Sequence, residues 1–207
     1  MNSKLLWVVV PLVVICLAGV FYLSEKLWES ESWLRKDAFV VYEQFFVWNG
    51  ESTVEYMVWN VTDLRDGIVD LRLVSHGVNV TNGNVELTLG ESGLTMDKAT
   101  RVVLSGGESV APYIGDRWPF WIETNVAMGS TIDTWYGPAA IERDERIYVL
   151  GQKRKVWAVE YAWASGSMTR WYDQATGVLL KIHNVLVRDG VAIVVTETAV
   201  LTSVDLG

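Results

Sequence analysis

The chain begins with one long apolar run and continues as a domain in which short apolar stretches alternate with turns. Residues 5–23 contain nineteen residues without a single charge. A helix needs roughly 20 apolar residues to cross a bilayer, so this run predicts one transmembrane helix. No later window is both as long and as free of charge.

A cleaved signal peptide is the alternative to a retained membrane anchor. Signal peptides have an apolar stretch of about 7–15 residues and end in small residues. The run over residues 5–23 is longer, and it ends in the bulky sequence VFYL. Both interpretations stay open, and the length of the run and its bulky end favour an uncleaved anchor.

The short segment before the run sets the expected orientation. The positive charges of residues 1–4 are those of Lys4 and the terminal amine. Basic residues also follow the run, so the positive-inside rule gives little support to either orientation. We expect residues 1–4 to form a cytoplasmic head and the rest of the chain to be extracytoplasmic. Residues 24–37 then read as an amphipathic stem, in which a few apolar residues can share one helix face.

Residues 38–207 have the signature of a single antiparallel β domain. Dense β-branched and aromatic residues are punctuated by Asn49-Gly50, Asp66-Gly67 and Asp189-Gly190, the dipeptides that favour tight hairpin turns. The fold class predicted is therefore mainly β, a curved antiparallel sheet of half-barrel or sandwich type with little helix. The predicted strands are 38–48, 52–61, 68–75, 84–89, 100–105, 130–136, 145–150, 155–163, 167–173, 178–187 and 191–201.

Two stretches of this domain lack a clear strand pattern. Residues 91–99 are expected to form a short helix or a loop. Residues 106–120 contain two prolines and several glycines and predict the longest loop, which would divide an N-terminal from a C-terminal half of the sheet.

The most distinctive local sequence is WYDQATGVLL at residues 171–180. Asp173 can accept backbone N–H groups across this turn, and Gly177 can adopt a positive φ. The pattern resembles the hairpin of uncharacterised prokaryotic, especially archaeal, single-span envelope proteins. Some of these domains are similar to lipoprotein-carrier folds, in which a half-barrel sheet covers a helix. This resemblance implies a hydrophobic groove, and it carries no catalytic residues.

Charge and cysteine content narrow the possible functions. The net charge is −8, and all 25 acidic residues lie beyond the apolar run. An acidic domain is a poor partner for nucleic acid or for an anionic lipid surface. The single cysteine, Cys16, lies inside the run, so the β domain has no disulfide and no thiol nucleophile.

No sequence motif predicts catalysis, a metal site or a cofactor. His76 and His183 each lack a second His or Cys nearby, as a zinc site would require. Neither a nucleotide-binding glycine motif nor a G-x-S-x-G elbow is present. The charged run at residues 142–146 reads as a solvated turn, and the basic residues 153–155 read as a hairpin tip.

Aromatic residues and sequons give the only candidate surface features. Trp118, Trp121 and Trp135 flank the loop over residues 106–120, and we predict that they form a ligand or partner surface. Asn60 and Asn79 begin N-x-T sequons, which could be glycosylated if the domain is exported.

These observations favour a membrane-anchored, extracytoplasmic, non-catalytic binding or assembly module of the cell envelope. Its expected partners are the bilayer, through residues 5–23, and a protein or a second copy of the chain. The alternatives are an accessory subunit of a larger membrane complex, a carrier of a lipid or small hydrophobic ligand and, last, a hydrolase.

Overall fold

The computed structural model describes residues 34–48, 51–81, 84–106, 113–134, 136–149, 151–188 and 191–203. The predicted head, the apolar run and most of the predicted stem lie outside these residues. The described end of the stem, residues 34–37, includes a turn that leads into the first strand. None of the described residues forms a helix long and apolar enough to cross a membrane.

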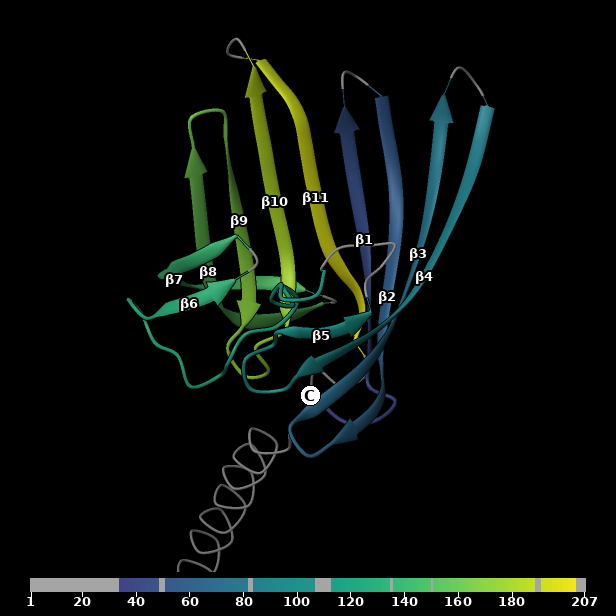
Figure 1. Ribbon diagram of the computed structural model, residues 1–207. Helices are drawn as coiled ribbons and strands as arrows, with labels where there is room; N and C mark the ends of the chain where they lie inside the picture. The colour runs from purple at the N-terminus through teal and green to yellow at the C-terminus, as the bar shows by residue number, and fades with distance from the viewer. Residues whose placement is uncertain are drawn as a thin grey trace, which may run out of the picture. The chain divides into compact units, whose positions relative to one another are not determined.

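The described domain consists of β-strands joined mostly by short turns (Figure 1). This confirms the predicted mainly β class, and each predicted strand overlaps one observed strand. The strands are β1 (Phe39–Trp48), β2 (Glu51–Arg65), β3 (Ile68–Thr81), β4 (Asn84–Asp97), β5 (Val103–Gly106), β6 (Thr131–Thr134), β7 (Gly137–Val149), β8 (Gln152–Trp163), β9 (Gly166–Asp173), β10 (Leu179–Arg188) and β11 (Val191–Ser203).

The described strands form one hydrogen-bonded sheet, in the order β5-β4-β3-β2-β1-β11-β10-β9-β8-β7-β6. Apart from β5 and β6, consecutive strands pair as antiparallel hairpins, as the turn dipeptides predict for several of them. The first and last strands also pair with each other, with Tyr42 opposite Val200. The N-terminal and C-terminal halves of the sheet therefore meet at the β1–β11 pair, and the two edges are β5 and β6.

The prediction of a short helix or loop at residues 91–99 is wrong for most of that stretch. Strand β4 continues to Asp97, with Leu94 opposite Leu71 and Met96 opposite Val69. Both β4 side chains are buried, while Thr95 between them is only half-buried. This alternation is a strand pattern, and the polar and glycine residues before it conceal it in the sequence.

The core lies on one face of the sheet, which we call the inner face. On β3 the side chains of Val69, Leu71 and Leu73 are buried, and the intervening Arg72 is exposed. The same period of two places Val156, Ala158 and Arg154 on the opposite face of β8 from Trp157 and Val159. The inner face carries Val159 on β8 and the three buried β3 side chains, while Val156 and Ala158 on the other face of β8 are buried as well.

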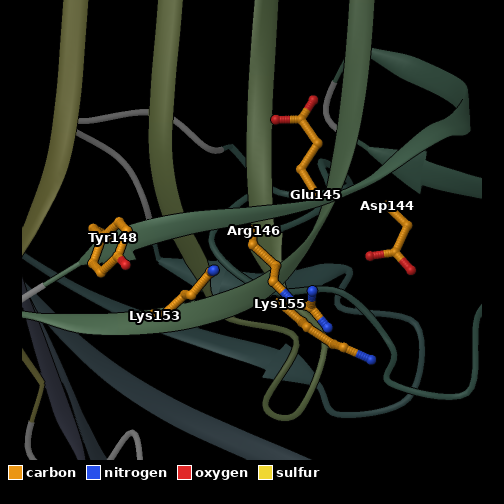
Figure 2. Close-up of a pocket in the computed structure, with 6 residues that line it drawn as sticks. All are labelled: Asp144, Glu145, Arg146, Tyr148, Lys153 and Lys155. Carbon is orange, nitrogen blue, oxygen red and sulfur yellow. The ribbon is translucent and has the colours of Figure 1, made fainter.

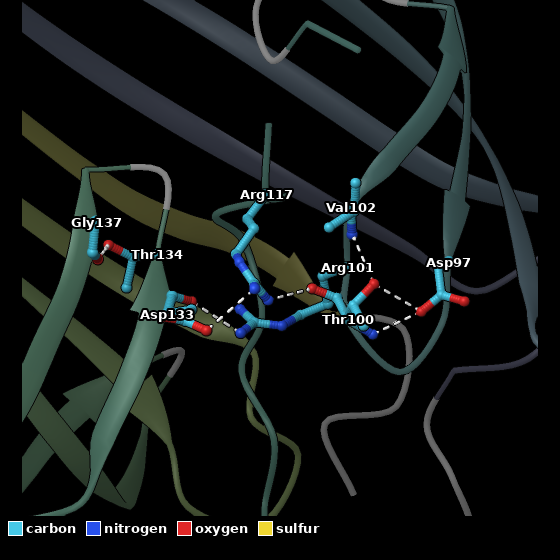
Figure 3. A network of polar contacts seen from close by, with 8 residues as sticks. All are labelled: Asp97, Thr100, Arg101, Val102, Arg117, Asp133, Thr134 and Gly137. Carbon is cyan, nitrogen blue, oxygen red and sulfur yellow. Dashed lines mark hydrogen bonds and ion pairs between the residues drawn. The ribbon is translucent and has the colours of Figure 1, made fainter. Parts of the chain in front are cut away.

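The sheet is strongly curved, because its two edges come together. Ten strand spacings of about 4.8 Å would hold the edges of a flat sheet about 48 Å apart. Arg101, two residues before β5, nevertheless donates from Nη2 to the carbonyl oxygen of Asp133 on β6, at 2.9 Å. Arg117 forms an ion pair with the Asp133 carboxylate at 3.0 Å (Figure 3).

The chain between β5 and β6 fills the concave side of this curve. We call residues 113–130 the inner segment, and it lies across the lower part of the sheet as seen in Figure 1. It contacts β2 through Trp118 and Trp59, and β1 through Phe120 and Tyr42. The sequence predicts a loop here, but the described part of that loop is a structural element of the core.

The turn between β9 and β10 fastens the inner segment to the sheet. Asp173 accepts hydrogen bonds from the backbone N–H of Thr176 at 3.1 Å and from its hydroxyl at 2.8 Å. Gly177 has a φ of 73°, and its carbonyl accepts the N–H of Ile122 at 2.9 Å. A Cβ on Gly177 would lie 2.1 Å from the Ile122 carbonyl oxygen.

Replacing Gly177 with alanine should therefore destabilise the domain strongly. The positive φ costs about 1–2 kcal/mol for a residue with a Cβ, and the clash with Ile122 adds about 1–3 kcal/mol. Gly151→Ala is the matched control, because Gly151 also has a positive φ, 78°, with nothing within 4 Å of its Cβ position. Denaturant unfolding of the full-length chain in detergent measures both losses, and equal losses would contradict this account.

Candidate functional site

The described tryptophans of the predicted contact surface are buried in the core. Trp118 is 0% exposed and Trp121 is 5% exposed. Their ring centroids lie 6.1 and 5.6 Å from that of Trp59. This burial does not agree with the prediction that they present a ligand or partner surface. They act instead as packing groups that hold the inner segment to β2, while Trp135 lies outside the described residues.

Buried hydrogen bonds fix the inner segment as firmly as its aromatic contacts do. The hydroxyl of Tyr172 donates to the carbonyl of Pro119 at 3.1 Å, and Arg101 Nη1 donates to the carbonyl of Trp121 at 2.8 Å. Burial lowers the pKa of Arg101, because removal from water disfavours its charged form. Figure 3 shows how Arg101, next to the β5 edge, and Arg117, in the inner segment, both reach toward Asp133.

A second cationic group lies under aromatic rings on the inner face of β9. Arg170 is 3% exposed, and its guanidinium carbon lies 4.8 Å from the ring centroid of Tyr136 and 6.0 Å from that of Tyr161. The hydroxyl of Tyr161 shares a hydrogen bond with Thr134. Burial raises the pKa of Tyr161 to about 12, so this phenol stays neutral at physiological pH.

An open pocket of about 610 Å³ lies on the β7–β8 hairpin (Figure 2). It brings together the two charged stretches that the sequence places at a solvated turn and a hairpin tip. The register explains this, since Arg146 stands opposite Lys155 and Tyr148 opposite Lys153. The residues that line it are Asp144, Glu145, Arg146, Tyr148, Lys153 and Lys155.

The pocket combines an exposed aromatic ring with three cations and two carboxylates, those of Asp144 and Glu145, which leaves a net positive charge. Tyr148 is 76% exposed, and the Lys153 ammonium lies 6.0 Å from its ring centroid. Glu145 is already engaged by Arg143 at 2.7 Å and by the Trp171 indole at 3.2 Å. Within the described part of the chain, the three cations of the pocket form no ion pair. The result is a basic, aromatic surface on an acidic protein, suited to a partner of opposite charge.

Sequence reasoning did not single out Tyr148 as a contact residue. Its signal was an aromatic residue one step from the end of a strand, between Ile147 and Val149. Such a position is common in ordinary hairpins, so the sequence alone gives no reason to prefer it. Its exposure and the lysine beside its ring become visible only with the β7–β8 register.

The two histidines do not form a joint site. His76 is exposed on β3, and His183 is half-buried on β10. These strands are four positions apart in the sheet order, about 19 Å along the sheet. Over the residues that the structure describes, no group of three or more His, Cys, Asp or Glu side chains is placed to hold a metal ion.

The two sequons lie within strands. Asn60 on β2 is half-buried and stands between Phe39 and Arg72 of the adjacent strands. Asn79 on β3 is paired through the backbone with positions on β2 and β4. Glycosylation of both residues stays a prediction.

No protein-family model and no curated protein matches the chain. Several solved structures resemble it, including the following three. A Bacteroides fragilis protein described as exported, with a YmcC-like fold, has 9% identity and a TM-score of 0.42, over 80% of this chain and 94% of its own. A protein of Parabacteroides distasonis described as a lipoprotein has 10% identity and a TM-score of 0.38, over 80% and 94%. A Vibrio parahaemolyticus domain described as outer-membrane lipoprotein-sorting has 12% identity and a TM-score of 0.28, over 86% and 88%. The function therefore has to be inferred from this chain's own residues.

Removing the Trp118 side chain should unfold the inner segment. Loss of a fully buried tryptophan costs about 3–5 kcal/mol, because it leaves a cavity that its neighbours cannot fill. Trp163→Ala is the control, since Trp163 is one of the exposed large side chains of the domain, and it should cost less than about 1 kcal/mol. Chemical unfolding of both variants measures the difference, and a small loss for Trp118→Ala would show that it is not a packing group.

Alkaline pH should destabilise the domain through Tyr161. Its pKa is about 12 in the folded chain and about 10 when unfolded, so the unfolded state loses the proton first. The contribution of the neutral Tyr161 phenol to the stability of the folded domain is therefore complete below pH 10, and it is lost as the pH rises from 10 to 12. Melting temperatures between pH 9 and 12 should fall less steeply for Tyr161→Phe than for the wild type. Tyr148→Phe, at an exposed position, should follow the wild type, and identical slopes for all three would refute the assignment.

Proposed function

We propose that this protein is a non-catalytic binding or assembly module of the cell envelope, anchored by residues 5–23 and displaying its β domain on the extracytoplasmic side. The uncharged run and the acidic domain beyond it support this location. The predicted topology, with residues 1–4 in the cytoplasm, is part of the same proposal.

The observation that carries the proposal is that the chain's own inner segment occupies the inner face of the sheet. Trp118 and Phe120 fill the space in front of β1 and β2, where a half-barrel carrier would place an apolar ligand. Because the chain itself fills the space in front of β1 and β2, a protein partner would bind on an outer surface. The β7–β8 pocket is a concave outer surface of the described residues at which such a partner would bind.

The chemistry of this pocket indicates a macromolecular partner with an acidic surface. Exposed tyrosine and arginine side chains are frequent energetic centres of protein interfaces. Tyr148 and Arg146 supply these groups, and Lys153 and Lys155 add positive charge around them. A second copy of this acidic chain would satisfy the charge requirement as well as a different protein would.

Two of the three alternatives from the sequence, the carrier and the accessory subunit, have weaker support, and the third, a hydrolase, stays the last of them. A carrier of a lipid or small hydrophobic ligand needs apolar space that Trp118 and Phe120 take up in the described structure. An accessory subunit of a membrane complex would use the same outer surface, and it differs in having several defined partners. The composition of the isolated complex therefore distinguishes it from a simple binding module.

Crosslinking followed by native mass measurement tests the proposal. The full-length chain is treated with a lysine-reactive crosslinker in its own membrane, extracted in mild detergent and weighed. We expect one complex of defined stoichiometry, with crosslinks from Lys153 and Lys155. The double variant Tyr148→Ala, Lys153→Glu should lower the complexed fraction at least fivefold, because it removes the aromatic contact and reverses a charge.

The control is Tyr113→Ala, which removes an exposed tyrosine from the inner segment, 57% exposed in the wild type. Its complexed fraction should equal that of the wild type. A wild-type chain that runs only as a monomer, or a double variant that assembles normally, would refute the proposal. Several different partners in one stable complex would favour the accessory-subunit alternative.

A further inference from the structure

Arg170 is a buried charge without a counter-charge among the described residues. Its Nη1 lies 3.5 Å from the Tyr172 hydroxyl, the limit of a hydrogen bond, and its Nε has no hydrogen-bond partner. No ion pair of the described residues includes it. Burying an arginine in this state costs several kcal/mol of stability, since arginine does not lose its charge in proteins.

The other buried arginines of the domain show that this is not a general property of the fold. Arg154 donates from Nε and Nη2 to both carboxylate oxygens of Asp173, at 3.1 and 2.8 Å. Arg101 donates to two backbone carbonyls and so ties the sheet edges together. Arg154 and Arg101 each donate two hydrogen bonds to protein acceptors, although the Nε of Arg101, like that of Arg170, has no hydrogen-bond partner among the described residues. Around Arg170 the described residues offer two aromatic faces and the Tyr172 hydroxyl at 3.5 Å.

A second unmatched polar group lies on the same face beside Arg170. Asn184 on β10 stands opposite Met168, and Ile182 stands opposite Arg170, so Asn184 is a diagonal neighbour of Arg170 at about 7–8 Å between Cα atoms. The Asn184 side-chain oxygen is buried and has no hydrogen-bond partner among the described residues. Two adjacent unmatched polar groups indicate a place where a bound molecule supplies the missing partners.

The surroundings of Arg170 select the chemical class of that molecule. The planar guanidinium matches a carboxylate, which can accept two parallel hydrogen bonds from it. The side chains on either side across the sheet, Val159 and Ile182, are aliphatic. Tyr136, whose ring lies over the guanidinium, is itself 56% exposed, so the site lies close to solvent on that side.

We propose that Arg170 binds the carboxylate of a small organic acid with an apolar body, on the inner face of β9 beside Tyr136, Tyr161 and Asn184. The carboxylate would accept hydrogen bonds from Nε and an Nη of Arg170, and the apolar body would lie against the tyrosine rings. Asn184 would hydrogen-bond a polar group of the same molecule. This site is separate from the β7–β8 pocket and does not depend on the function proposed for that surface.

Calorimetric titration of the full-length chain in non-ionic detergent tests this site. The probe is sodium hexanoate, compared with hexanamide, which has the same carbon chain without the charge, and with sodium phosphate at equal ionic strength. We expect saturable binding of one hexanoate per chain, and at least tenfold weaker binding of hexanamide and of phosphate. Equal affinity for hexanamide would exclude the charge interaction, and equal affinity for phosphate would exclude the selection for carboxylate.

Arg170→Met should abolish hexanoate binding without lowering the melting temperature. Replacing a buried unpaired charge by an apolar side chain of similar volume is neutral or stabilising. The matched control is Arg72→Met, because Arg72 is exposed on β3 and already paired with Glu91 at 2.8 Å. Binding should survive in this control.

A second variant keeps the test decisive if Arg170→Met fails to fold. Arg170→Lys retains the charge but lacks the planar pair of donors, so it should bind hexanoate at least tenfold more weakly. Failure of the wild type to bind hexanoate, or undiminished binding by an Arg170 variant, would overturn the proposal. Because no partner protein takes part, neither result bears on the function of the β7–β8 pocket.

Discussion

The structure depends on closing a long antiparallel sheet on itself by means of its own connecting segment. The two edges of a flat eleven-stranded sheet lie far apart. In this domain the guanidinium of Arg101 connects them, because it donates a hydrogen bond from the residues before β5 to Asp133 on β6. It joins the region before β5 to Trp121 and Asp133, two points of the chain that sequence places far away. Its buried charge is tolerated because backbone carbonyls accept its hydrogen bonds.

This closure explains why the domain is so rich in tryptophan. A curved sheet leaves a wide concave space, and the described strands alone do not fill it. The inner segment supplies Trp118, Phe120 and Trp121, which pack on Trp59 and Tyr42 from the sheet. Large rings fill such a space with few residues, and their T-shaped and tilted contacts add to the area they bury. The domain thus achieves a packed core without any disulfide.

The strands could be predicted from sequence signals that act within a few residues. The pairing of distant strands and the position of the inner segment could not, because they depend on contacts between residues far apart in the sequence. Turn dipeptides such as Asp66-Gly67 and the period of two in side-chain character identify part of each described strand, because both signals act within a few residues. They miss the second half of β4, where polar and glycine residues hide the pattern. The β1–β11 pair and the position of Trp118 depend on residues far apart in sequence. A tryptophan beside a glycine-rich loop has the same local signature on a surface as in a core. The sequence shows the charged residues of the β7–β8 pocket. It does not show the strand register that places them around Tyr148.

Arg154 and Arg170, on the adjacent strands β8 and β9, differ in whether the structure explains them. Arg154 and Arg170 project from adjacent strands, and both are removed from most solvent. Arg154 is fully explained by Asp173, whose carboxylate also caps the turn that holds Gly177 against Ile122. Nothing comparable explains Arg170, since methionine or leucine would fill its place without the cost of a buried charge. A costly group with no structural partner is best understood through a molecule that binds it, and the inner face beyond the inner segment is where that molecule would lie.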